Sequence, residues 1–300
     1  MLSVTIITPS YNQGRYIERT IRSVMTQSFA GRLEHWVIDG GSRDETVDIL
    51  RRYAPPAAAT PSCLQWISEK DRGQPDAVNK GFARATGDII GWLNSDDTYY
   101  PGAVATAAQY LEQHPEIDVV YGGGNHIDEE DRFLETYPTE DWDFERLKEY
   151  CYLCQPAAFF RRSVVERFGP LDVQWQYVLD YEYWLRLARG GARFARIGEV
   201  LAATRLHSAT KTLGSRVKVH AEHNDMLRAL FGRTPDRWLY NYAHAVLDDR
   251  GEERGSPRYA VDVAMLSWWS ALRWNRRITL SMLRQGAVWI QSGIREGHRR

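Results

Sequence analysis

The sequence has few cysteines and no long apolar run. Cys63, Cys151 and Cys154 are too few for the disulfide framework of a small secreted protein. Cys151 and Cys154 have the C-x-x-C spacing of some zinc and redox sites, but no second pair accompanies them, which favours structural thiols in a reducing compartment. No stretch approaches the roughly 18 apolar residues of a membrane span, and residues 1–8 lack the features of a signal peptide. We therefore expect a cytoplasmic protein.

The sequence also lacks an excess of charge of either sign. Its 38 Lys and Arg residues are balanced by 39 Asp and Glu residues, which gives a net charge of −1. A chain without an overall positive field is not expected to bind nucleic acid. Its 300 residues are 43% hydrophobic and 26% charged, which is typical of a globular protein with one large domain, or a medium one and a small one.

The first 121 residues alternate short apolar runs with amphipathic segments. The apolar runs indicate strands, and the segments between them have helical spacing. We predict strands at 4–8, 35–39, 64–68, 89–93 and 118–121, and helices at 16–27, 42–52, 74–85 and 103–114. Ser42 and Glu45 are expected to form a capping box that opens the second helix. Strands separated by helices predict an α/β domain with a Rossmann-like, mostly parallel central sheet flanked by helices.

The pattern becomes less regular after about residue 122. Helices are expected at 142–150, 162–168 and 180–189, a strand at 157–160, and one or two strands at 194–206. From about Ser208 the strand patterns stop, and helices are expected at 217–231, 238–247, 259–274 and 278–294. We therefore predict an α/β domain over residues 1–210 and a C-terminal helical extension over residues 211–300.

Polar segments follow three of the predicted strands. They are Thr8-Pro9-Ser10-Tyr11, Asp39-Gly40-Gly41-Ser42 and Asn94-Ser95-Asp96-Asp97. In open α/β sheets, ligands bind beyond the carboxyl ends of the strands. We therefore expect the three segments to meet in one crevice.

The third segment contains two adjacent carboxylates. Asp96 and Asp97 repel each other unless they are neutralised, and Mn²⁺ or Mg²⁺ prefers carboxylate and water oxygens as ligands. Such an ion could bridge a diphosphate and stabilise its charge as it leaves. His207, at a later strand end, could add a nitrogen ligand. The alternatives are a polar turn in which Asp97 or Thr98 caps the next helix, and a histidine in the core or on the surface.

The first two segments carry groups suited to a nucleoside. Tyr11 can stack on a base, Thr8 can hydrogen-bond to it, and Asp39 can accept from a base N–H or a ribose hydroxyl. The glycines after Asp39 allow the backbone to approach a ligand closely. The alternatives are a helix cap with a packed tyrosine at the first segment, and a loop in which Asp39 bonds to the backbone.

A further carboxylate, Asp180, stands at the predicted start of a helix beside aromatic residues. It can act as a general base toward a sugar hydroxyl. Trp184 offers an aromatic face to a sugar ring. The alternatives are that Asp180 is a helix N-cap and that Trp184 belongs to the core.

In this order the motifs resemble the family-2 glycosyltransferases, which have the GT-A fold. The resemblance covers roughly residues 3 to 207 and rests on segments 8–12, 39–42, 71–73, 94–97 and 180–184. It implies a metal-assisted, inverting transfer from a nucleoside diphosphate sugar, expected to be a UDP-sugar, by a hexosyltransferase-type enzyme. The implied donor-binding residues are Thr8, Pro9, Tyr11, Asp39, Asp71, Asn94, Ser95 and Asp96.

The resemblance also assigns the remaining roles. Asp96 would hold the metal, Asp180 would be the catalytic base, and Gln155 would lie on the acceptor side with Trp184. Asn94 departs from the Asp-x-Asp motif of the family and removes one charge, which predicts looser metal binding or a different metal. The chain lacks the Gln-x-x-Arg-Trp motif and the membrane helices of processive synthases, which predicts one sugar per encounter.

Two other functions compete with this interpretation. A sugar nucleotidyltransferase would need a glycine-rich loop with Arg and Lys after the first strand, but residues 9–14 contain a single glycine. A non-catalytic sugar-nucleotide binding protein is disfavoured because Asp96, Asp97 and Asp180 are all present.

Residues 257–300 mix four tryptophans with arginines. A basic helix with tryptophans can lie on an anionic membrane surface, here the inner face of the membrane. That would suit a lipid-linked glycan acceptor in polysaccharide or cell-surface glycan biosynthesis. The alternative is an extension that packs its tryptophans on the catalytic domain or on a second subunit of a homodimer.

Overall fold

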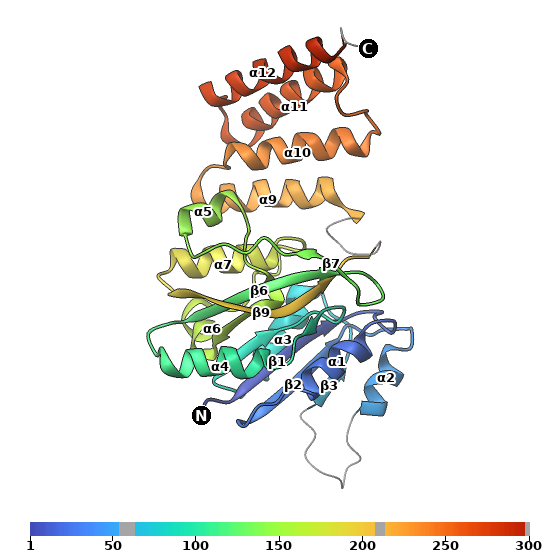
Figure 1. Ribbon diagram of the computed structural model, residues 1–300, viewed down its shortest axis with the longest axis vertical. Helices are drawn as coiled ribbons and strands as arrows, with labels where there is room; N and C mark the ends of the chain where they lie inside the picture. Colours follow the sequence, from blue (N-terminus) through green and yellow to red (C-terminus); the bar gives the residue numbers. More distant parts are fainter. Residues whose placement is uncertain (54–63, 208–213, 298–300) are drawn as a thin grey trace. The chain divides into compact units, whose positions relative to one another are not determined.

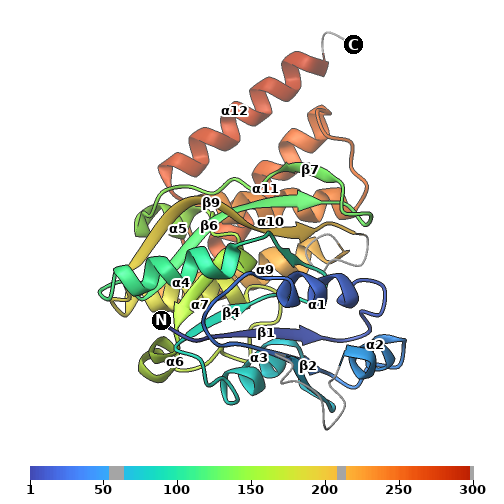
Figure 2. The ribbon, with the colours of Figure 1, turned by 60° about the horizontal axis from the view of Figure 1, so that its bottom comes forward.

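The computed structural model describes residues 1–53, 64–207 and 214–297, with side chains as far as Gly293. The chain forms two compact units (Figures 1 and 2). The N-terminal unit comprises Met1–Leu147 and Cys151–His207, and the C-terminal unit comprises Lys148–Tyr150 and the chain from Ser208.

The described part of the N-terminal unit is built on a nine-stranded mixed sheet. Its strands are β1 (Val4–Ser10), β2 (Leu33–Asp39), β3 (Leu64–Ser68), β4 (Ile89–Trp92), β5 (Thr98–Tyr99), β6 (Val119–Ile127), β7 (Phe133–Thr136), β8 (Ala158–Arg161) and β9 (Phe194–Arg205). Their order is β3-β2-β1-β4-β8-β6-β9-β5, with β7 paired to β6.

The predicted parallel strands lie side by side at one end of this order. β3, β2, β1 and β4 are parallel neighbours. β8 is antiparallel to both β4 and β6, and β6 is parallel to β9. β5 and β7 were not predicted, because a two-residue strand and an exposed four-residue strand show little apolar periodicity. β6 continues to Ile127 instead of ending at Tyr121.

Helices cover both faces of the sheet (Figures 1 and 2). They are α1 (Ile17–Met25), α2 (Thr46–Tyr53), α3 (Gln74–Phe82), α4 (Ala103–Gln113), α5 (Phe144–Glu149), α6 (Arg162–Phe168) and α7 (Leu179–Arg189), with the 3₁₀ turn η1 (Gln155–Ala157). The predicted helices are present, with ends displaced by a few residues.

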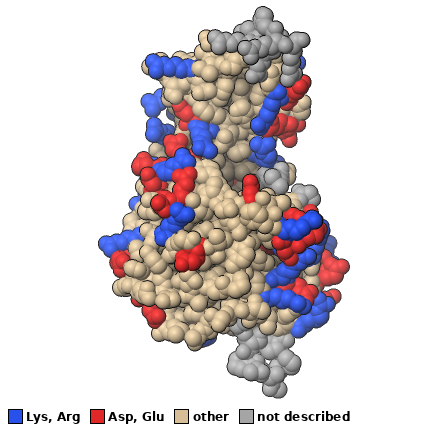
Figure 3. All heavy atoms as spheres, in the orientation of Figure 1, with Lys and Arg blue, Asp and Glu red and all other residues tan. Residues whose placement is uncertain are grey.

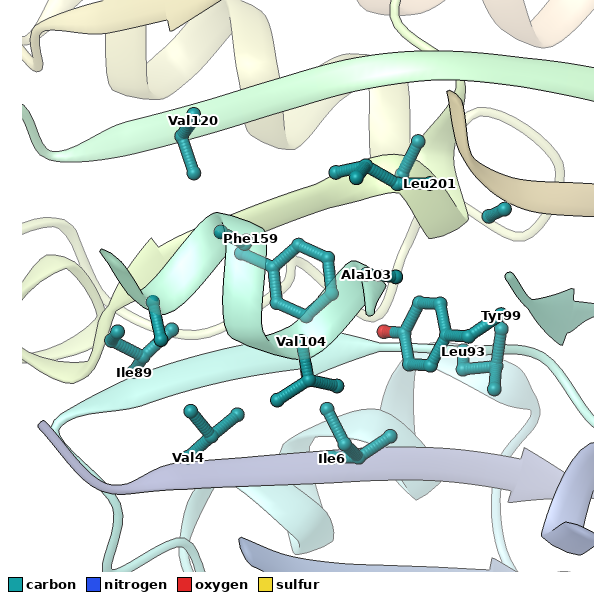
Figure 4. Packing of buried hydrophobic residues seen from close by; sticks show 14 of the residues in the cluster. Val4, Ile6, Ile89, Leu93, Tyr99, Ala103, Val104, Val120, Phe159 and Leu201 are labelled. Atoms are coloured by element: carbon teal, nitrogen blue, oxygen red, sulfur yellow. The ribbon is translucent and has the colours of Figure 1, made fainter. Parts of the chain in front are cut away.

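Two adjacent phenylalanines of β8 show how the two faces are packed. Phe159 lies in a cluster with Val4, Ile6 and Val104, the last from α4 (Figure 4). Phe160 points to the opposite face, where Tyr183 of α7 lies against it. Successive strand residues point to opposite sides of a sheet, so both can be fully buried. Each such side chain stabilises the fold by about 1.5–3 kcal/mol.

The predicted capping box at Ser42 is wrong. α2 begins at Thr46, and the Asp44 carboxylate accepts the Thr46 N–H at 3.1 Å. The Ser42 hydroxyl instead donates to Asp39 and accepts the Asn12 N–H at 2.7 Å. Because the Ser42 hydroxyl is bonded to Asp39 and Asn12, it does not cap α2.

The C-terminal unit consists of four helices, each packed on the next, over the described residues (Figure 1). They are α9 (Arg216–Phe231), α10 (Asp236–Asp249), α11 (Pro257–Asn275) and α12 (Leu280–Gly297). Trp274 is 2% exposed and donates to Asp225 at 2.8 Å. None of the described helices combines the length and apolar character needed to cross a membrane.

On the face of the N-terminal unit shown in Figure 3, acidic and basic side chains are interspersed. This pattern agrees with the net charge of −1.

Candidate functional site

The turn Asn94–Asp97 directly follows the last residues of β4 and is held in place by α1. The Thr20 hydroxyl of α1 lies 2.9 Å from the carbonyl oxygen of Ser95 and 2.7 Å from that of Asp97, and it shares one proton between them. Thr98 belongs to β5, and α4 begins only at Ala103. The turn therefore caps no helix.

Asp96 and His207 meet beyond the strand ends. Asp96 Oδ2 lies 3.0 Å from His207 Nε2, and the His207 ring packs on Tyr16 with 4.9 Å between ring centroids. Two neighbouring ligands of an octahedral ion, each about 2.1 Å from the metal, lie about 3 Å apart. The spacing of the pair therefore fits Mn²⁺ or Mg²⁺ as well as a direct hydrogen bond.

Asp96 and His207 could together supply two protein ligands to a metal ion. Within the described ranges, no group of three or more His, Cys, Asp or Glu side chains is arranged to hold a metal ion. Mg²⁺ is commonly held in proteins by one or two carboxylates, substrate phosphates and water. A site of this kind would depend on a phosphate-bearing ligand to complete it.

Asp97 points into the protein, away from this pair. It is 5% exposed and accepts the backbone N–H of Arg205 at 3.0 Å and the Asn94 amide at 3.1 Å. Burial, and then the Asp96 carboxylate, raise the pKa of Asp97 well above its usual range. Asp97 thus supports the turn, and Asp96 is the carboxylate placed to meet a ligand.

Asn94 connects four neighbours. Its Oδ1 accepts from Gln74 at 2.8 Å and from the Trp92 indole at 3.1 Å. Its Nδ2 donates to Asp97 at 3.1 Å and to Gln155 at 2.9 Å. The amide needs both its acceptor and its donor, and a carboxylate has no N–H to donate. The neutral residue at this position therefore matches its surroundings.

Gln155 is held by the same network. It is 8% exposed, and its Nε2 donates to the Trp92 carbonyl oxygen at 2.6 Å while its Oε1 accepts from Asn94. Its side chain thus fixes η1 to the end of β4. The side-chain amide of Gln155 is therefore already hydrogen-bonded within the protein, and an acceptor substrate would have to contact it in addition to these bonds.

The ends of β1, β2 and β3 meet at Gly40. A methyl group built on Gly40 would lie 2.6 Å from Asp71 Oδ2 and 3.3 Å from Tyr11 Cδ2. The Tyr11 side chain is 59% exposed, so it is not packed into the core, and its ring is free to stack. The absence of a side chain at Gly40 therefore lets the Tyr11 ring and the Asp71 carboxylate both lie close to the backbone at the end of β2.

Four predicted donor-binding residues lie deeper, among them Ser95, which is 4% exposed. Asp39 is fully buried and accepts from the N–H groups of Gly41 and Ser42 and from the hydroxyls of Ser42 and Ser68, as in the alternative of a structural loop. Thr8 is buried, 3.0 Å from His35, whose pKa burial lowers to about 3. Pro9 is also buried, in β1. These residues are buried under the strand ends and support them, instead of facing a ligand.

Asp180 lies in the first turn of α7. The residue preceding the helix is Val178, so Asp180 is not its N-cap. Burial raises the pKa of Asp180 above its ordinary value. Burial also raises the pKa of the Cys151 thiol, and the charge of Asp180 adds to this effect. Asp180 therefore occupies a poorly solvated position suited to a proton acceptor.

The two described cysteines, Cys151 and Cys154, are free thiols, as expected of structural cysteines, and Cys63 lies outside the described residues. Burial raises the pKa of Cys154, and the charges of Asp97 and Asp180 both add to this effect.

Trp184 lies in the core. It is 0% exposed, with Phe160 and Tyr183 packed against it. Its faces are covered, so the structure matches the alternative of a core tryptophan. The aromatic spacing of segment 180–184 could not distinguish a packed ring from an exposed one.

The structure adds residues that the motifs did not identify. Gln74, which opens α3, joins the Asp71 side of the site to Asn94. Gln176 lies over Gly73, since a methyl group there would be 2.3 Å from Gln176 Oε1. The buried Arg205 contacts the Asn94–Asp97 turn. The sequence did not single out Arg205, because the same strand also contains Arg196 and Glu199, which are both exposed.

Comparison with known proteins relates this chain to glycosyltransferases. The family model described as glycosyl transferase family 2 matches residues 5–169. An uncharacterized glycosyltransferase of Mycobacterium tuberculosis is 34% identical over 188 residues, which are 62% of this chain and 69% of the relative. A PGL/p-HBAD biosynthesis glycosyltransferase of Mycobacterium bovis is 28% identical over 201 residues, 67% of this chain and 75% of the relative.

Solved structures show the same fold at lower identity. TarS residues 1–349 of S. aureus, in complex with UDP-GlcNAc, has a TM-score of 0.64 and 13% identity, covering 97% of this chain and 89% of that one. The mannosyltransferase PcManGT of Pyrobaculum calidifontis, in complex with GDP-Man and Mn²⁺, has a TM-score of 0.59 and 20% identity, covering 98% and 84%.

Proposed function

Because the chain belongs to glycosyl transferase family 2 and is a glycosyltransferase, we propose that it moves one sugar, with inversion, from a nucleoside diphosphate sugar to an acceptor hydroxyl. A UDP-sugar is the proposed donor, and a glycan or lipid-linked glycan is the proposed acceptor. The single observation that supports this best is the meeting of Asp96 with His207 at 3.0 Å, beside the strand ends that carry Tyr11 and Asp71.

The donor is proposed to lie across the strand ends. Tyr11 stacks on the base, and the carboxylate of Asp71 accepts from the base or the ribose. The diphosphate extends toward Asp96 and His207, which hold a divalent ion. When bound, that ion stabilises the negative charge that develops on the leaving diphosphate.

Asp180 is the proposed base. Its carboxylate takes the proton of the acceptor hydroxyl while the acceptor oxygen attacks the anomeric carbon opposite the diphosphate. A raised pKa favours this role, because a carboxylate with a higher pKa is a stronger proton acceptor. Deprotonating an acceptor in this way is typically worth about 10²–10⁴-fold in rate.

The relatives support the choice of substrates in outline. One structural neighbour is described with UDP-GlcNAc and another with GDP-Man and Mn²⁺, so nucleotide-sugar donors and a divalent ion are compatible with this fold. One relative is named for PGL/p-HBAD biosynthesis, which is in keeping with a cell-surface glycan or lipid-linked acceptor.

The test is a donor screen with product detection. Purified protein is incubated with UDP-, GDP- and dTDP-sugars, and release of the nucleoside diphosphate is measured with and without Mn²⁺ or Mg²⁺. We expect release from a UDP-sugar, its abolition by EDTA, and its restoration by added Mn²⁺. Full activity in chelator would exclude Asp96 and His207 as metal ligands, and tight donor binding without release would indicate a non-catalytic binding protein.

A surface of the C-terminal unit is the proposed contact with a membrane. Val261, Met265, Trp269 and Leu272 follow one another at helical spacing along α11, and they are 41%, 56%, 47% and 53% exposed. We call them the α11 stripe. Four arginines and no acidic residue occur between positions 263 and 293. An exposed apolar stripe within a basic segment matches an anionic lipid surface.

A hollow beside the α11 stripe is consistent with the same partner. It is lined by Arg250, Glu252, Arg258, Asp262, Met265, Leu266 and Trp269. Its two arginines and two acidic residues lie beside exposed apolar side chains, and Arg258 is paired with Asp262 at 3.5 Å. Peripheral contact would bring the enzyme to a lipid-linked acceptor, whereas a homodimer formed through this stripe is the competing outcome.

A further inference from the structure

Arg205 is a charged residue in an unusual place. It ends β9, two residues before His207, and its side chain is 0% exposed. An arginine is almost never fully buried unless it is paired, because desolvating the guanidinium is costly. The hydrogen bonds that offset this cost join Arg205 to the backbone of Asp96 and to the turn between β6 and β7.

The guanidinium connects the Asn94–Asp97 turn to the turn between β6 and β7. Its Nε donates to the carbonyl oxygen of Asp96 at 2.9 Å. Its Nη1 donates to the carbonyl oxygen of Asp128 at 2.6 Å, and its Nη2 is paired with the carboxylate of Asp131. All three guanidinium nitrogens are therefore occupied, one by the Asn94–Asp97 turn and two by the turn between β6 and β7.

Arg205 also supports His207. Its Cζ lies 5.2 Å from the centroid of the Tyr16 ring, and that ring packs on the imidazole of His207. The backbone N–H of Arg205 donates to Asp97 at 3.0 Å. Arg205 thus contacts the backbone of Asp96 and also the Tyr16 ring that packs on His207.

The far side of the network is fixed to α1. Arg19 reaches the second oxygen of Asp131 at 3.2 Å and donates to the carbonyl oxygen of Glu129 at 2.7 Å. Arg15 is paired with Glu129. The turn at residues 128–132 is therefore held between a buried arginine and a helix, although Asp131 itself is half exposed.

We infer that Arg205 is a positioning residue for the Asp96–His207 pair and that Asp131, on the surface, acts through it. Arg205 fixes the carbonyl of Asp96 and the ring that supports His207, so the two ligands keep the spacing that a divalent ion needs. This inference rests on the proposed function in one respect, that the pair binds a metal. It adds two residues that touch neither the metal nor the sugar.

The test changes each end of the Arg205–Asp131 pair. Arg205→Lys keeps the charge but cannot reach three acceptors at once. Asp131→Asn removes the charge while keeping the shape, and asparagine tolerates the positive φ of 68° at this position. Glu130→Gln is the matched control, because it removes one carboxylate from the same turn and Glu130 contacts Arg15 and Arg132 rather than Arg205.

Mn²⁺ binding is measured directly, by titration of the protein with UDP present, so that the result does not depend on turnover. Residues that support metal ligands typically change affinity by roughly 10- to 100-fold. We expect Arg205→Lys and Asp131→Asn to weaken Mn²⁺ binding within that range and Glu130→Gln to leave it unchanged. In the transfer assay, kcat should return near the wild-type value at saturating Mn²⁺, because Asp180 is untouched.

The outcomes separate this inference from the proposed function. If the wild-type protein binds Mn²⁺ and both variants bind it equally well, Arg205 and Asp131 have no positioning role, whatever the transferase activity. If Glu130→Gln weakens binding as much as Asp131→Asn, the effect is one of surface charge and the inference fails. If the wild-type protein binds no Mn²⁺, the metal assignment and the inference fall together. Should Arg205→Lys not fold, Asp131→Asn alone decides.

Discussion

At the scale of single residues, Asp180 shows how burial changes chemistry. Its pKa is raised because the charged form is poorly solvated. The base form is required for transfer, so kcat/KM should rise with pH through a midpoint above about 3.9, the ordinary value for Asp. Asp180→Asn should lower kcat by about 10²–10⁴-fold and remove this limb of the pH profile. Glu199→Gln, which changes an exposed carboxylate of β9, is the control.

The same pKa shift predicts how stability changes. A carboxyl whose pKa is higher in the folded state binds its proton more tightly there, so its contribution to stability is present at low pH and is lost as pH rises through the folded-state pKa. Asp180→Asn should therefore leave the free energy of unfolding at pH 7 equal or higher. A large loss of stability in this variant would mean that the carboxylate is structural.

At Asn94 the neutral side chain matters, because its amide N–H groups donate to Asp97 and Gln155. Asn94→Asp would restore the Asp-x-Asp pattern but would lose the donors to Asp97 and Gln155 and bring two carboxylates together. We expect it to destabilise the protein by about 1–3 kcal/mol and not to tighten Mn²⁺ binding. Asn241→Asp in α10, whose side chain makes no hydrogen bond among the described residues, controls for the added charge. Tighter metal binding in Asn94→Asp would contradict this account.

At the scale of elements, the sequence predicted whether a segment is a strand or a helix better than it predicted which contacts the residues of that segment make. Apart from the two-residue strand β5, the strands and helices up to residue 121 follow from apolar periodicity, because that signal is local. What each strand end does was less predictable. Ser42 was expected to cap α2, but Asp39 and Asn12 bind it. Trp184 was expected near an acceptor, but α7 turns it toward Phe160. Helical spacing identifies the apolar side of α7, but it does not show which of the apolar side chains on that side stay accessible to a ligand.

The α11 stripe is an element-scale feature with its own test. The protein is sedimented with vesicles of phosphatidylcholine, with and without phosphatidylglycerol. We expect binding only to the anionic vesicles, weakened by salt because each arginine near the surface adds about 1 kcal/mol of screened attraction. Met265→Gln with Trp269→Gln should abolish it.

A matched variant controls for loss of any exposed aromatic group. Phe133→Gln changes a side chain that is 60% exposed on β7 of the N-terminal unit, and it should bind vesicles as the wild type does. If the wild-type protein ignores anionic vesicles but forms a dimer that Met265→Gln with Trp269→Gln disrupts, the stripe is a subunit contact instead.

At the scale of the whole molecule, the expected α/β fold of the GT-A type with C-terminal helices is confirmed by the family match and the structural neighbours. The sheet is more mixed than the first 121 residues indicated, because β8 enters antiparallel between β4 and β6. That insertion carries η1 and Gln155 to the end of β4. It brings the second half of the chain to the site formed by the first half.

Most of the strands and helices, the polar segments at the strand ends, and the family that these segments resemble could be predicted from the sequence. Such information is local, since apolar periodicity and turn residues act over a few positions. The folding of the chain in three dimensions decided that Asp96 meets His207, which lies 111 positions away, and that Asp97 turns inward. It also decided that Asn94 has two acceptors to satisfy and that Arg205 is buried behind the pair. Strand pairing and burial set these distances, and no pattern along the chain encodes them residue by residue.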